Sequence, residues 1–178
     1  MAQAKRKQKF FDVEMPIINK ETQLYAFDLE DLKNRTVSYD LTRFLRGKNI
    51  LLKLKIKIEN DNAIAEPTEI TVLPYFIRRM MRKGTNYVED SFSVMCKNAQ
   101  VRIKPFLITR KKVSRAIRKA LREKAREELS DYVRGKDTET LFDDIIKNKI
   151  QKHLSLVLKK TYPLSLCEIR VFKVEKEL

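Results

Sequence analysis

Residues 50–58 carry the clearest strand pattern in the chain, and this pattern limits the fold class. Its apolar and basic residues alternate without a break: Leu52, Lys53, Leu54, Lys55, Ile56, Lys57 and Ile58. A period of two places the apolar side chains on one face of a strand and the lysines on the other. The pattern therefore predicts a sheet with one buried and one solvated face. We interpret the three lysines as surface residues; contact with RNA is the less favoured alternative.

Several further segments have β-like patterns, and one contains a proline that restricts its pairing. The other β-like runs are 23–29, 36–42, 64–73, 87–96, 99–108 and 165–174. The run at 64–73 can return beside 50–58 after the polar turn at 59–62, with Pro67 limiting it to an edge or a bulge. The runs at 87–96 and 99–108 indicate a hairpin. Residues 17–22 are expected to form a loop.

Three segments have helical patterns. Residues 75–83 are expected to form a short helix closed by Gly84, with an apolar stripe at Phe76, Ile77, Met80 and Met81. A basic helix runs from about Lys112 to about Val133 and stops at Gly135. A last helix begins near Thr138 and must end before Pro163. The residues of this last helix that are spaced to face the core are Phe142, Ile146, Ile150, His153 and Val157.

This order of elements predicts an α+β fold. The sheet is expected to be mainly antiparallel and barrel-like, flanked by helices, with an extended basic N-terminal arm. A length of 178 residues suits one domain. The expected organisation is a basic arm at 1–15 and a single α+β domain at 16–178.

The positive charge is concentrated in three clusters. The formal net charge is +15, and residues 101–126 alone hold eleven basic residues against one acid, Glu123. Residues 1–9 and 78–83 each hold four basic residues and no acid. Concentrated charge of this kind is typical of a surface that binds a polyanion, with a bland solvated basic surface as the alternative. Residues 1–9 lack large apolar groups, so we expect them to be extended.

The basic helix breaks local rules of helix stability. Arg115, Lys119, Arg122 and Arg126 share a face, with cations near the positive end of the helix dipole and like charges four residues apart. Val113, Ala116, Ile117 and Ala120 are expected to form the opposite, core-facing side. Such an arrangement has a cost that an external polyanion offsets.

Catalytic and metal-binding patterns are poor in this sequence. The single histidine, His153, is expected to be a structural core residue. Cys96 and Cys167 are far apart and are interpreted as reduced thiols of a cytosolic protein. The three glycines form no phosphate-cradling loop, and too few ligands exist for zinc. We therefore expect no enzymatic activity, no cofactor, no metal, no small-molecule substrate and no membrane partner.

Seven stretches, in collinear order, resemble one protein family. They are KQKFFDVEMP (7–16), QLYAFDLEDLKN (23–34), RGKNI (46–50), YFIRRMMRKGTNYVEDSF (75–92), VRIKPFLITRKK (101–112), VSRAIRKALRE (113–123) and TYPLSLCEIRVFKVEK (161–176). Together they are similar to the S3Ae family of small-subunit ribosomal proteins, shared by archaea and eukaryotes. The length, without a C-terminal tail, resembles the archaeal form.

The resemblance implies a structural protein of the cytoplasmic ribosome. Its expected place is the platform of the small subunit near the mRNA exit, packed on rRNA near the 3′ end. The expected partners are small-subunit rRNA and neighbouring platform proteins, with mRNA or initiation factors near the exit as further candidates. The alternative is a free-standing RNA chaperone or nucleic-acid-processing factor with the same basic surface.

The expected rRNA-binding residues come from the three basic clusters. They are Lys5, Arg6, Lys7, Lys9, Arg78, Arg79, Arg82, Lys83, Arg102, Lys104, Arg110, Lys111, Lys112, Arg115, Arg118, Lys119 and Arg122. Tyr75, Tyr87 and Phe106 lie near these clusters, but buried packing is favoured over base stacking for them. Recognition is therefore expected to depend on shape and phosphate contacts more than on base reading.

Overall fold

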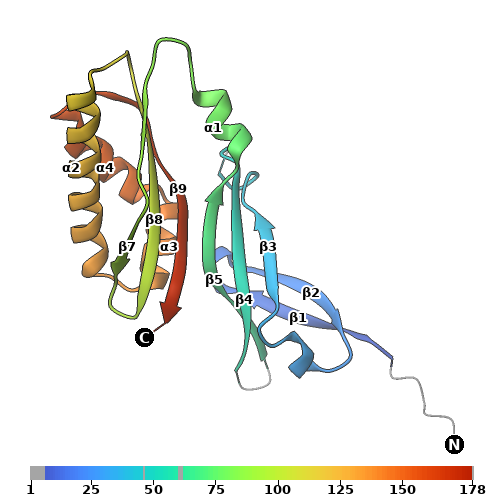
Figure 1. The fold of residues 1–178 in the computed structure, drawn as a ribbon. Helices are drawn as coiled ribbons and strands as arrows, with labels where there is room; N and C mark the ends of the chain where they lie inside the picture. Colours follow the sequence, from blue (N-terminus) through green and yellow to red (C-terminus); the bar gives the residue numbers. More distant parts are fainter. Residues whose placement is uncertain (1–6, 46, 60–61, 178) are drawn as a thin grey trace, which may run out of the picture. The chain divides into compact units, whose positions relative to one another are not determined.

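The computed structural model describes residues 7–45, 47–59 and 62–177, which form two compact units (Figure 1). Unit 1 comprises the described part of residues 1–39 and 52–68, and unit 2 that of residues 40–51 and 69–178. Two long strands, β4 (Ile50–Glu59) and β5 (Asn62–Val72), contribute to both units. The expected residues Lys5 and Arg6 lie outside the described part of the chain.

A hairpin of β1 (Lys9–Met15) and β2 (Lys20–Ala26) begins unit 1. The two strands pair antiparallel along their whole length and are joined by a 3-10 turn, η1 (Pro16–Ile18). Asn19 completes the turn in the left-handed region at φ 52°, which asparagine tolerates. The prediction of a loop at 17–22 is therefore wrong, because the chain turns within a few residues and β2 starts at Lys20.

The alternating segment forms β4 as its pattern predicts. Leu52, Leu54 and Ile56 are fully buried, and the lysines between them are half-buried. A 3-10 turn, η2 (Leu29–Leu32), and β3 (Thr36–Asp40) precede β4, and β3 pairs with it. Together with Val13, Met15 and Leu32, these β4 residues belong to the core of unit 1.

Pro67 lies where β5 changes partner. On one side of it, Ala63 and Ile64 pair parallel with β1. On the other side, residues 69–71 pair antiparallel with β9 (Leu164–Glu177). Proline has no amide hydrogen to donate to a β-ladder. Pro67 therefore lies between the stretch that pairs with β1 and the stretch that pairs with β9, in a strand that also pairs with β4.

Unit 2 has helices on one face of an antiparallel sheet (Figure 1). Its strands are β6 (Tyr87–Glu89), β7 (Phe92–Met95), β8 (Ala99–Thr109) and β9, and both β6 and β7 pair with β8. The helices on this face are α2 (Arg115–Arg134), α3 (Thr138–Ile146) and α4 (Lys149–Lys159), whereas α1 (Pro74–Met80) follows β5 and lies apart from them in Figure 1. Phe142 of α3 meets Phe172 of β9 edge to face at 5.0 Å between ring centroids. None of the described helices is long and apolar enough to cross a membrane.

The α+β class is confirmed, but the barrel-like closure is not. The strands pair in the order β2-β1-β5-β9-β8-β6, with β3 and β4 attached through β5 and β7 attached through β8. Among the described residues, the end strands β2 and β6 do not pair with each other, so the sheet is open. It is also mixed, because β1 and β5 are parallel.

The helix expected from Thr138 to Pro163 is two helices, and this changes which residues face the core. Asn148 adopts a left-handed conformation at φ 59°, which ends α3 and starts α4 on a new phase. In α4 the buried stripe is Ile150, Leu154 and Leu158. His153 is exposed, with its ring 5.7 Å from that of Tyr132 and its Nε2 3.8 Å from a Glu128 oxygen. The expectation of a core histidine is wrong.

We expect the substitution His153→Gln to change the free energy of unfolding by less than about 0.5 kcal/mol, as at other exposed positions. Its side chain is 52% exposed, and its Nε2 lies 3.8 Å from the Glu128 carboxylate, which is near the upper limit for an ion pair. Urea denaturation checks this. Leu154→Ala, one residue along the same helix and 1% exposed, is the control and should cost about 2–5 kcal/mol.

Candidate nucleic-acid interface

Helix α2 places most of the predicted charges, and its buried side differs from the expected one. Ser114 caps the helix by accepting a hydrogen bond from the Ile117 amide at 3.4 Å. The buried stripe is Leu121, Ala125, Leu129 and Val133, all four residues apart. Ala116 and Ala120, expected to face the core, are exposed. The larger apolar side chains further along the helix determine which face is buried, since they bury more surface than alanine.

The basic face of α2 consequently flanks the buried stripe instead of lying opposite it. At 100° per residue, Arg115, Arg122 and Arg126 fall beside Leu129 and Val133. This turns the arginines toward the edge of the sheet. Arg126 is already occupied there: its Nε and Nη2 donate to the two oxygens of Asp90 at 3.0 Å each, and its guanidinium lies 5.3 Å from the Phe92 ring centre.

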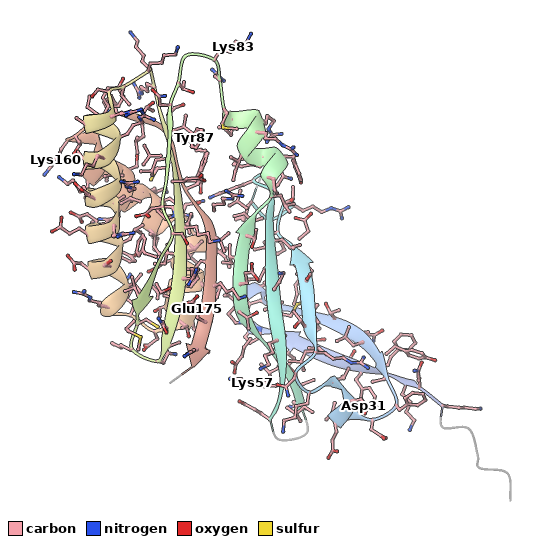
Figure 2. The ribbon with its side chains drawn as sticks, viewed as in Figure 1. Asp31, Lys57, Lys83, Tyr87, Lys160 and Glu175 are labelled. Atoms are coloured by element: carbon pink, nitrogen blue, oxygen red, sulfur yellow. The ribbon has the colours of Figure 1, made fainter. Side chains whose placement is uncertain are left out.

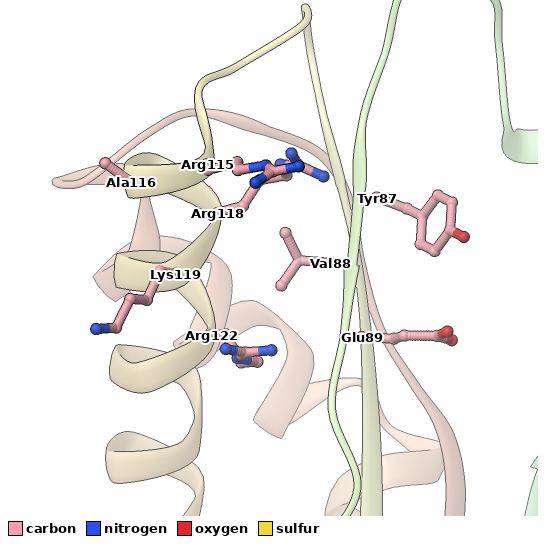
Figure 3. Close-up of a pocket in the computed structure, with 8 residues that line it drawn as sticks. All are labelled: Tyr87, Val88, Glu89, Arg115, Ala116, Arg118, Lys119 and Arg122. Carbon is pink, nitrogen blue, oxygen red and sulfur yellow. The ribbon is translucent and has the colours of Figure 1, made fainter.

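A groove of about 530 Å³ lies between α2 and β6. Its lining residues are Tyr87, Val88, Glu89, Arg115, Ala116, Arg118, Lys119 and Arg122, and we call it the α2–β6 groove. Figure 3 shows Arg115, Arg118 and Arg122 extending from the helix toward the strand, whereas Lys119 points away. Val88 points toward the helix, and Tyr87 and Glu89 point to the other side of the sheet. The side chains that enter the groove are therefore cationic or apolar.

Three arginines of the groove lack a counter-charge among the described residues. In the described part of the chain, no carboxylate forms an ion pair with Arg115, Arg118 or Arg122. Glu89, the one acid in the lining, pairs instead with Arg170 at 3.3 Å. The Nε of Arg118 is buried, and no described residue hydrogen-bonds to it. A buried donor without a partner is costly, so an acceptor supplied from outside would stabilise this site.

Two basic loops meet at a small hydrogen-bond network beside the groove. The buried Thr109 hydroxyl lies 2.9 Å from the Asn86 carbonyl oxygen and 2.7 Å from that of Lys111. The Asn86 side-chain oxygen accepts from the Val113 amide at 2.8 Å. This network joins the loop that carries Arg82 and Lys83 to the loop that carries Arg110, Lys111 and Lys112. Both loops lie at the same end of the sheet in Figure 1.

The basic cluster at residues 78–83 lies on α1 and in the loop that follows it. Arg78 and Arg79 are exposed, and the Arg79 guanidinium lies 5.4 Å from the ring centre of Phe76. The helix ends at Met80, earlier than expected, and Met81 is exposed. Arg82 and Lys83 are exposed in the loop that follows, where Lys83 projects outward (Figure 2). Gly84 closes this loop at φ 85°, a conformation that glycine adopts without strain.

The structure does not bring all predicted residues together. Arg102 and Lys104 alternate on β8 with buried residues and so occupy the sheet face away from the helices. Arg102 also donates from its Nε to Glu175 at 2.6 Å. Lys7 and Lys9 are exposed and belong to unit 1, whereas the groove belongs to unit 2. The described residues contain no group of three His, Cys, Asp or Glu side chains that could hold a metal ion.

Comparison with known proteins identifies the family. A model of the ribosomal S3Ae family matches residues 2–177. The chain is 28% identical to the small ribosomal subunit protein eS1 of Nanoarchaeum equitans over 174 residues, which cover 93% of this chain and 88% of that protein. It is 29% identical to the protein of the same name from Pyrobaculum aerophilum over 156 residues, which cover 85% and 71% of the two chains. The chain therefore belongs to the ribosomal S3Ae family.

Proposed function

We propose that this chain is a structural constituent of the small ribosomal subunit and acts in translation by binding rRNA. Contact is made through the α2–β6 groove and the two basic loops joined by Asn86 and Thr109. Its place is the platform near the mRNA exit, with rRNA and neighbouring platform proteins as partners. Membership of the S3Ae family and similarity to archaeal proteins named small ribosomal subunit protein eS1 support this proposal.

The observation that carries the proposal is the set of unpaired arginines in the groove. Arg115, Arg118 and Arg122 extend toward β6, where the one acid of the lining, Glu89, points away from them and pairs with Arg170. Phosphate oxygens match guanidinium groups in both charge and geometry, and binding releases counter-ions from the RNA. Contacts of this kind position a protein on RNA without reading bases, which suits a structural role.

The test is sedimentation of a cell extract containing the tagged full-length chain through a sucrose gradient. We expect the chain to travel with the small subunit at about one copy per subunit and to stay there at moderate salt. Chemical cross-linking of the same fractions should place it on small-subunit rRNA near the 3′ end. A chain found mostly free, at the top of the gradient, would favour the alternative of an RNA chaperone or processing factor.

A further inference from the structure

The outer face of the β1–β2 hairpin in unit 1 is exposed and chemically unlike the rest of this basic chain. Three cross-strand pairs share this face: Phe10 with Tyr25, Asp12 with Gln23, and Glu14 with Glu21. Alternation along each strand turns the neighbouring pairs, such as Val13 with Thr22, to the other side. All six side chains are exposed, and we call them the hairpin face.

At one end of the hairpin face lies an uncovered aromatic pair. Phe10 is 69% exposed and Tyr25 is 50% exposed, with ring centroids 4.9 Å apart. Phe27, one residue beyond β2, is also exposed. Exposed aromatic groups that cluster, unlike single exposed apolar residues, mark surfaces that a partner covers.

At the other end lie carboxylates that form no ion pair with any described lysine or arginine. Glu14 and Glu21 are directly opposite each other, and like charges in that position destabilise a hairpin. With Asp12 they line a hollow of about 370 Å³, and the described residues around it include no lysine or arginine. The Asp12 carboxylate accepts a hydrogen bond from the Gln23 side chain at 3.0 Å and, among the described residues, no other side-chain hydrogen bond. A cation supplied from outside would offset this repulsion.

We propose that the hairpin face docks an arginine-rich polypeptide segment of a partner protein. Guanidinium groups stack on aromatic rings and also form paired hydrogen bonds with carboxylates, so one residue type matches both ends of the face. RNA does not match it, because three carboxylates would face its phosphates. The proposal goes beyond rRNA binding and uses a different unit of the chain from the α2–β6 groove.

The test measures fluorescence anisotropy of a labelled peptide of alternating arginine and alanine, titrated with the full-length chain. We expect binding that weakens at least fivefold in the variant Glu14→Gln with Glu21→Gln, and also in Phe10→Ser with Tyr25→Ser. The matched control is Glu127→Gln with Asp131→Asn, which removes two exposed carboxylates four residues apart on α2. This control should bind as the unaltered chain does, and a lysine–alanine peptide should bind more weakly than the arginine peptide.

Two results would overturn the proposal. One is peptide binding that is absent, or that falls equally in the α2 control. The other is a loss of rRNA affinity in the Phe10 and Tyr25 variant with peptide binding intact, which would make the hairpin face an RNA surface. Binding of rRNA is measured in parallel, and its failure in the unaltered chain would refute the proposed function while leaving the peptide result to be judged separately.

Discussion

Replacement of Asp144 by asparagine is expected to lower the free energy of unfolding by about 2–3 kcal/mol. The Asp144 carboxylate is 8% exposed and joins three helical segments of unit 2. It accepts from the Tyr132 hydroxyl at 2.9 Å, from Lys136 at 2.5 Å, and lies 3.0 Å from the Lys149 Nζ. An amide keeps the shape but removes the charge that these donors share. Chemical denaturation of the variant and the unaltered chain measures the difference.

The same carboxylate should make stability sensitive to acid. Burial raises its pKa, but hydrogen bonds from Lys136, Lys149 and Tyr132 outweigh burial and lower the pKa from 3.8 to about 2. A lowered pKa in the folded state contributes stability above the unfolded value near 3.8, and this contribution is lost as the pH falls toward 2. A shift of this size corresponds to about 2–3 kcal/mol. The asparagine variant should lack this part of the acid dependence.

Asp143 provides the matched control for both effects. It is the preceding residue of α3, and its carboxylate forms an exposed pair with Lys147 four residues along the helix. Exposed pairs of this kind contribute about 0.3–0.5 kcal/mol, so Asp143→Asn should have little effect at any pH. Equal losses for the two variants would show that the charge of α3, and not the buried network, stabilises the helices.

Strands are the part of the fold that the sequence predicts best. In β4 the alternation of leucine or isoleucine with lysine directly determines which face is buried, because strand periodicity depends only on neighbouring residues. The β8 strand and its partners β6 and β7 are likewise found where their patterns predict a hairpin. The barrel-like closure expected of the sheet is not confirmed, since closure depends on pairings between segments far apart in the chain.

Helix faces are predicted less well, and both errors have a local physical cause. In α2 the alanines at 116 and 120 were assigned to the core, but Leu121, Leu129 and Val133 determine the buried side. Between α3 and α4 the break falls at Asn148, and neither proline nor glycine marks it. The new helix starts with a different phase, and this phase exposes His153. A single continuous helix, as expected from the sequence, would have placed His153 on the buried side.

The sequence identifies the basic residues of the candidate site, but not which of them are paired internally or where the groove lies. Arg102 and Arg126 resemble their neighbours in sequence, yet Glu175 and Asp90 hold them in internal pairs. The α2–β6 groove needs β6 to lie beside a helix that begins 26 residues after β6 ends, which no local pattern reveals. Asn86 and Thr109 were missed as well, because their role is to hold two basic loops together.

Replacement of Arg115, Arg118 and Arg122 by glutamine is expected to weaken rRNA binding by roughly tenfold or more at moderate salt. Each lost phosphate contact should also reduce the slope of log affinity against log salt by almost one unit, so the slope should flatten by about two to three units. The loss should be similar for different RNA sequences, because phosphate contacts carry no base information. Filter binding across a range of salt concentrations measures both quantities.

The control must remove the same charge from the same unit. Lys152, Lys159 and Lys160 are exposed on or just after α4, outside the groove, and their replacement by glutamine also lowers the net charge by three. If affinity depends on the overall field of a chain with net charge +15, the two triple variants should lose the same slope. If it depends on the groove, only the α2 variant should lose slope.

Because Arg118 is half-buried, the double variant Arg115→Gln with Arg122→Gln separates lost contacts from altered packing. Its slope should still fall by one to two units, and equal slopes for the α2 and α4 variants would contradict the groove as the binding site.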